Sequence, residues 1–208
     1  MPNPTLVTQA WILSKRPPAE TFETVTCFSA EHGTLTLLSR VVRKAATTQP
    51  NFDLFDEVSL HLESRNQGRT WFVQESNLLV RHRDIGRSYE TLRYASLFAS
   101  LIARNEVTED TRGTVYDLAR TAFASFASNA CPDIVYFKSL YCFARDEGYP
   151  LKQQWFPTLP CELREHASHW LRTPLSQLPN HADAFPLLVT LQQHLEDYLR
   201  AHTDILLG

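Results

Sequence analysis

The sequence predicts an α+β chain in which a five-stranded barrel precedes an all-helical bundle. Five short segments rich in β-branched and aromatic residues lie before Leu78, and apolar residues recur at helical spacing only after it. The third segment, from Gly33 to Lys44, is entered through a glycine turn and ends in a basic corner. We therefore expect a boundary between Glu75 and Ser88, with a barrel domain in residues 1–80 and a helical domain in residues 81–208.

The barrel is expected to contain strands at residues 5–13, 22–29, 34–43, 58–64 and 70–75. Pro17 and Pro18 should end the first strand, because proline cannot donate to a strand ladder. Gly33 supplies the positive φ of the second turn, and Gly68 does so in the loop before the fifth strand. Residues 45–50 should be a loop, and residues 51–57 a bridging segment. This number and order of strands match the OB-fold, although other small barrels share the strand count.

Helical periodicity predicts five helices, at residues 88–104, from Asp110 or Thr111 onward, and at residues 133–147, 160–171 and 184–202. The third of these is apolar almost all round, so it should be the central helix of the bundle. Pro132 favours its start, and Gly148 followed by Pro150 favours its end.

Composition limits the function. The formal net charge is −3, so a nucleic-acid site must be a local patch. No apolar run approaches the roughly eighteen residues of a spanning helix, and the amino terminus lacks the pattern of a secretory signal. We therefore expect a cytoplasmic protein without a membrane partner. Its cysteines have no paired spacing and should be reduced core thiols; they are Cys27, Cys131, Cys142 and Cys161.

A candidate binding surface follows from the OB-fold, whose ligand crosses strands two and three between two loops. Seven cations fall on or beside that surface: Lys15, Arg16, Arg40, Arg43, Lys44, Arg65 and Arg69. Trp71, Phe72 and Phe28 are nearby aromatic residues that could stack on bases. The alternative interpretation is that these are ordinary loop charges and core aromatics.

Metal binding and catalysis have less support. Cys142, Cys161, His166 and His169 are of ligand type, but the two cysteines lack the close spacing of a structural zinc site. The same four residues would have to converge in one cleft to make a thiol- or histidine-dependent hydrolase. A phosphate-binding glycine loop, a nucleophile elbow and a His-Glu-x-x-His motif are all absent from the sequence. We expect no enzyme activity, no metal or other cofactor, and no small-molecule substrate.

Several phrases, in order along the chain, resemble the family of the bacterial recombination mediator RecO. They lie at residues 10–21, 25–33, 39–44, 93–95, 137–150, 173–175 and 198–202. The chain departs from the family at two places. Many members carry a four-cysteine zinc module after a Gly-Tyr-x-Pro turn, whereas residues 151–161 form a short link without it. Val41 replaces the usual glycine of the basic corner.

The resemblance implies a non-enzymatic protein of DNA recombination and DNA-damage repair. Such a protein binds and anneals single-stranded DNA, contacts single-strand-binding protein and RecR, and helps to load RecA at gaps. It would be bacterial, cytoplasmic and associated with the nucleoid. The alternative is a protein-interaction scaffold that keeps the fold and has lost DNA binding, which the acidic helical domain favours.

Overall fold

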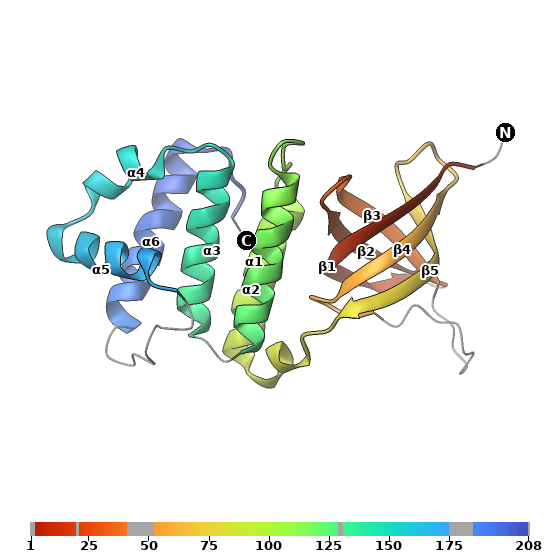
Figure 1. The fold of residues 1–208 in the computed structure, drawn as a ribbon, viewed down its shortest axis with the longest axis horizontal. Helices are drawn as coiled ribbons and strands as arrows, with labels where there is room; N and C mark the ends of the chain where they lie inside the picture. Colours follow the sequence, from red (N-terminus) through yellow and green to blue (C-terminus); the bar gives the residue numbers. More distant parts are fainter. Residues whose placement is uncertain (1–2, 20, 41–51, 129–130, 175–184, 208) are drawn as a thin grey trace. The chain divides into compact units, whose positions relative to one another are not determined.

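The computed structural model describes the chain except residues 1–2, 20, 41–51, 129–130, 175–184 and 208. It is a mixed α+β structure in which five strands are followed by helices (Figure 1). The chain divides into two compact units. The barrel unit contains Met1–His82 and Glu106–Tyr116, and the helical unit contains Arg83–Asn105 and Asp117–Gly208.

The strands are β1 (Thr5–Ala19), β2 (Phe22–Ser29), β3 (Gly33–Arg40), β4 (Glu57–Ser64) and β5 (Trp71–Val80). They are hydrogen-bonded in the order β1-β2-β3-β5-β4, and the pairing of β1 with β4 closes the sheet into a barrel. Every pair is antiparallel except β3 with β5, which is parallel. The prediction of a five-stranded sheet followed by helices is confirmed.

The prediction that Pro17 and Pro18 end the first strand is wrong, because β1 continues to Ala19. Its pairing with β2 is irregular between Arg16 and Ala19, and β4 pairs with it only as far as Trp11. The prolines therefore lie where a regular ladder does not demand a backbone N–H, which is the position that proline tolerates in a sheet.

The other strands agree with their predicted bounds to different extents. β2 has the expected bounds, and β5 extends past Glu75 because it pairs with β4 until Val80 lies opposite Glu57. β3 is described as far as Arg40, so its predicted continuation to Arg43 lies outside the described residues, as does the predicted loop at residues 45–50.

The barrel core is formed by inward-facing side chains of the strands, together with Phe52 from the segment that precedes β4. Its buried members are Ala10, Ile12, Val25, Cys27, Leu37, Phe52, Val58, Leu60 and Leu62. Alternation along each strand places one side chain in two on this inner face. The residues between them therefore face outward.

An ion pair ties the two ends of the β4–β5 hairpin together. Asp56 immediately precedes β4 and is 1% exposed, and Arg81 immediately follows β5. The Nη2 atom of Arg81 lies 2.7 Å from Oδ2 of Asp56, and its Nε donates to the same carboxylate. The backbone of Asp56 also accepts a hydrogen bond from the N–H of Ile12 in β1 (3.0 Å).

The segment Glu106–Tyr116 belongs to the barrel unit although it follows the first long helix. The hydroxyl of Tyr116 donates to a carboxylate oxygen of Glu57 (2.8 Å), which is 4% exposed. The Tyr116 ring also lies 6.0 Å from that of Trp11, between centroids. This segment therefore covers polar and aromatic groups that the strands alone would leave on the outer face.

The helices are α1 (Tyr89–Arg104), α2 (Arg112–Ala127), α3 (Pro132–Asp146), α4 (Leu151–Gln154), α5 (Cys161–Arg172) and α6 (Phe185–His202). α3 contacts α1, α4, α5 and α6 and is buried on most of its circumference, which confirms its predicted central place. Sequence periodicity missed α4 and the 3-10 turns η1 (Arg83–Arg87) and η2 (Phe156–Thr158), because each is too short to show a helical repeat.

We expect Asp56→Ala to destabilise the protein by about 1.5–3 kcal/mol, because it removes the charge-assisted hydrogen bonds that Arg81 donates to the buried carboxylate. The matched control is Asp84→Ala, which removes the exposed partner of Arg87 and should cost less than about 1 kcal/mol. Urea denaturation followed by circular dichroism measures both. Equal losses in the two variants would show that the buried pair adds nothing special.

Candidate nucleic-acid interface

A row of outward side chains crosses four strands of the barrel. Val25 of β2 and Leu37 of β3 are fully buried in the core, so their sequence neighbours face outward. The strand register aligns one outward residue from each of β1, β2, β3 and β5, namely Arg16, Thr24, Leu38 and Phe72. The row therefore carries a cation on β1 and an aromatic ring on β5.

A second row, two residues further along β2 and β3, adds another ring and another cation. Phe22 lies opposite Arg40 in the register. The rings of Phe22 and Phe72 meet edge to face, with centroids 5.7 Å apart and planes at 79°. The guanidinium of Arg65 lies over the Phe72 ring, 5.1 Å from its centroid. This favourable cation–π geometry fixes Arg65 beside the two rings.

We call this surface the aromatic–basic face and define it by Arg16, Phe22, Leu38, Arg40, Arg65 and Phe72. The three arginines are exposed, and the other three side chains are half-buried. An acidic residue borders the face, because Glu63 of β4 lies opposite Phe72. Its carboxylate accepts a hydrogen bond from the side chain of Gln74 (3.0 Å).

The loop between β4 and β5 presents Arg65 and Arg69 on a fixed backbone. The buried hydroxyl of Ser64 accepts the N–H groups of Gly68 (2.8 Å) and Asn66 (3.3 Å). Gly68 has φ +85°, the left-handed conformation that favours glycine. Arg69 is exposed in this loop. Backbone order here means that little conformational freedom is lost when the loop binds a ligand.

Lys15, one of the seven predicted surface cations, has a different environment from the others. It lies opposite Val25, on the inner side of the sheet. Its Nζ donates to the backbone carbonyl of Phe52 (3.2 Å), lies over the Phe52 ring and pairs with Glu23 (3.5 Å). The structure therefore holds Lys15 at the edge of the core, and its role in binding stays a prediction.

The predicted cations are only partly brought together. Arg16, Arg40 and Arg65 share the aromatic–basic face, and Arg69 lies in the adjoining loop. Arg43 and Lys44 lie outside the described residues.

The accessibility of the aromatic side chains differs from the prediction. Phe28 is 0% exposed and so has no surface on which a base could stack. Trp71 packs partly against the barrel core, whereas Phe72 faces outward. Sequence reasoning missed Phe22. This residue lies two positions before Thr24, and residues two apart in a strand share one face, so its place on the outer side of β2 could have been inferred.

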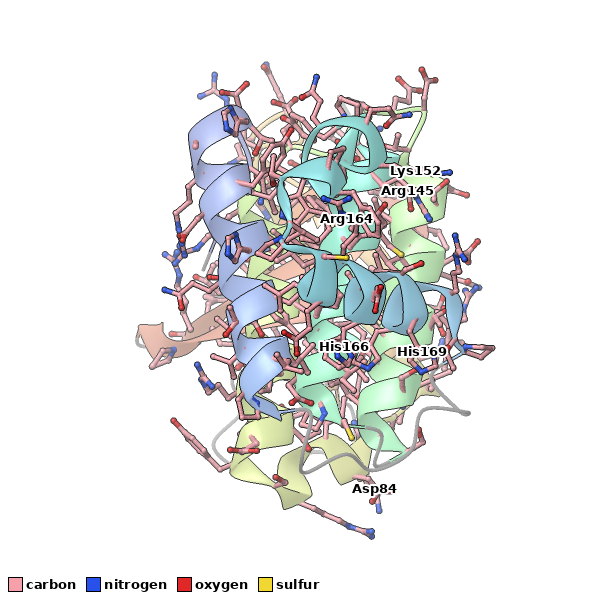
Figure 2. The ribbon with its side chains drawn as sticks, turned by 90° about the vertical axis from the view of Figure 1, so that its left-hand side faces the viewer. Asp84, Arg145, Lys152, Arg164, His166 and His169 are labelled. Atoms are coloured by element: carbon pink, nitrogen blue, oxygen red, sulfur yellow. The ribbon has the colours of Figure 1, made fainter. Side chains whose placement is uncertain are left out.

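The ligand-type residues of the helical unit show no metal site. Figure 2 shows His166 and His169 along α5. The ring of His166 packs on Trp170, with centroids 5.5 Å apart. Cys142 is half-buried and Cys161 exposed. Within the described ranges, no group of three or more histidine, cysteine or acidic residues could hold a metal ion.

Three other cations, Arg145, Lys152 and Arg164, lie toward the upper end of the helical unit in Figure 2, away from the two histidines. Arg145 pairs with Asp146 (2.7 Å), and Arg164 donates to the carbonyl of Leu159 (2.8 Å). Two of these cations are thus engaged in local contacts. The aromatic–basic face of the barrel unit is the better candidate for binding a polyanion.

The expectation that all four cysteines are core thiols is wrong. Cys27 is buried, but Cys131 and Cys142 are half-buried and Cys161 is exposed. Burial raises the pKa of the Cys27 thiol to about 12 and also raises that of Cys142. The reactive thiolate is therefore disfavoured at both positions.

We expect iodoacetamide at pH 8 to alkylate Cys161 first and to leave Cys27 unmodified until the barrel unfolds, because Cys27 lacks both access and thiolate. Peptide mass spectrometry over a time course measures this order. A urea-unfolded sample is the control in which all four thiols should react. If Cys27 of the native protein reacted as fast as Cys161, Cys27 could not be buried in the barrel core.

Comparison with models of known protein families and with curated proteins finds no match for the chain. In the part of the chain that the structure describes, every helix is too short or too polar to cross a lipid bilayer. The barrel unit has three exposed arginines on the same outer face as a pair of aromatic rings.

Proposed function

We propose that the chain is a RecO-like recombination mediator. In this proposal it binds and anneals single-stranded DNA and helps to load recombinase at gaps during DNA repair, without catalysing a reaction itself. Single-strand-binding protein and RecR are its proposed partners. The observation that carries the proposal is the aromatic–basic face, with Arg16, Arg40 and Arg65 exposed around two half-buried rings.

We also propose that the strand unit is an OB-fold. Support comes from the strand order β1-β2-β3-β5-β4 and from the parallel pairing of β3 with β5. An OB-fold binds oligonucleotides across strands two and three, between the first-to-second and fourth-to-fifth loops. The aromatic–basic face covers these strands, and Arg65 and Arg69 belong to the fourth-to-fifth loop.

Annealing requires a protein that holds a strand by its phosphates and leaves the base edges free to pair. Arginine suits this task, because its planar guanidinium binds phosphate through two parallel hydrogen bonds. Phosphate contacts carry no sequence information, so binding should tolerate any base composition. Four exposed arginines, Arg16, Arg40, Arg65 and Arg69, are available for such contacts. Each phosphate they neutralise should contribute about −0.7 to the log–log salt slope on single strands.

We expect Arg16→Glu with Arg40→Glu to weaken binding of a single-stranded oligonucleotide at least about tenfold at 50 mM salt. The salt slope should flatten by about 1.4, since two phosphate contacts are lost. Fluorescence anisotropy at several salt concentrations measures both quantities.

The charge-matched control is Arg87→Glu with Arg120→Glu, two exposed arginines of the helical unit. It makes the same change in net charge and should leave the slope unchanged. Equal weakening by both double variants would show that only total charge matters. Absence of binding by the unmodified protein at low salt would favour the scaffold that has lost DNA binding.

A further inference from the structure

We propose that Phe22 and Phe72 form a stacking platform for an unpaired nucleobase, which makes the aromatic–basic face selective for single strands over duplex. This inference rests on the proposed function and assigns a chemical role to two rings. The arginines supply attraction for any polyanion, whereas the rings supply a contact that only an unstacked base can make.

The two rings lie outside the hydrophobic core of the barrel. Both belong to the outer side of the sheet and are half-buried, and they pack on each other edge to face at 5.7 Å. The outer side of β2 and β3 near them otherwise carries Leu38 and four threonines, Thr24, Thr26, Thr34 and Thr36. An apolar patch on an otherwise polar strand face marks the place where a flat, apolar ligand surface would gain most.

Each ring has a cation beside it. Arg40 lies opposite Phe22 in the β2–β3 register, and the guanidinium of Arg65 stacks over Phe72. A guanidinium plane can itself receive a base on its other side, so Arg65 extends the platform as well as contacting phosphate. Arg16 and Phe72 lie at the two ends of the row that runs across β1, β2, β3 and β5. At the usual spacing between strands this row is about 14–15 Å long. The face thus offers base contacts and phosphate contacts along one path.

Stacking on this platform should give single strands a higher binding affinity than duplex. A base inside a duplex is already stacked on both sides, and presenting it to the protein costs the energy of unstacking and unpairing. A single-stranded base has a free π-face at lower cost. Every base has such a face, so the platform favours single strands without reading their sequence.

The test compares three probes of equal length: a thymidine oligonucleotide, an abasic oligonucleotide with the same phosphates, and a duplex. The unmodified protein should bind the thymidine probe about 5- to 150-fold more tightly than the abasic probe. This range corresponds to stacking of about one base. The thymidine probe should also bind more tightly than the duplex. Phe72→Leu should reduce the thymidine-to-abasic ratio to near one, whereas Phe72→Tyr, which keeps the ring, should preserve it.

Phe22→Leu provides a second variant, with the same expected loss of the ratio. Val7→Ala is the control, because Val7 is an exposed apolar residue near the other end of β1. It should leave the ratio unchanged. Circular dichroism checks that each variant remains folded. The thymidine-to-abasic ratio of the unmodified protein tests the platform even if a variant fails to fold.

The outcomes separate the two proposals. Tight binding with a thymidine-to-abasic ratio near one would overturn the platform and leave phosphate binding in place. A large ratio that both leucine variants retain would also overturn it, because the base would then stack elsewhere. Failure of the unmodified protein to bind either single-stranded probe at low salt would overturn the proposed function itself.

Discussion

The ion pair between Asp56 and Arg81 is the interaction on which the barrel depends. It joins the residue before β4 to the residue after β5, and the backbone of Asp56 is hydrogen-bonded to Ile12 of β1. Three segments distant in sequence are thus fixed at one point, where the sheet closes. The carboxylate tolerates burial because it is met by a guanidinium and by the backbone N–H of Asp53.

Closure of the sheet fixes which side chains face outward. Once β1 pairs with β4, a shift of one residue in any strand would expose the buried core and bury the charges. Val25 and Leu37 are therefore held inside, and Arg16 and Phe72 are held on the same outer row. The geometry of the candidate site follows from the core on the opposite side of the same sheet and from the irregularity of β1 after Ile12, which places Arg16 on the outer side.

Sequence patterns predicted the elements whose ends are marked by turn residues. β2 was found with its bounds, because Pro17 and Pro18 precede it and Gly33 follows it, although its last three residues are all buried and do not alternate. β5 was predicted too short, because its second half does not alternate between core and surface. Leu78, Leu79 and Val80 are all exposed, and only pairing with β4 defines this part of the strand. Lys15 was grouped with the surface cations, because sequence does not show that an irregularity after Ile12 aligns it with the inner residue Val25. The basic residues and Phe72 were named from the sequence, but the contact between Phe22 and Phe72 became visible only in the structure.

The segment that ends at Tyr116 has a consequence for how this architecture can be divided or inherited. The chain leaves the barrel unit after His82, returns at Glu106 and leaves again within α2. A gene fragment that stops at His82 would encode every strand but would lose the hydroxyl that donates to the buried carboxylate of Glu57. The two units are thus interleaved in the coding sequence, and neither could be exchanged between proteins by a single recombination event without leaving part of itself behind.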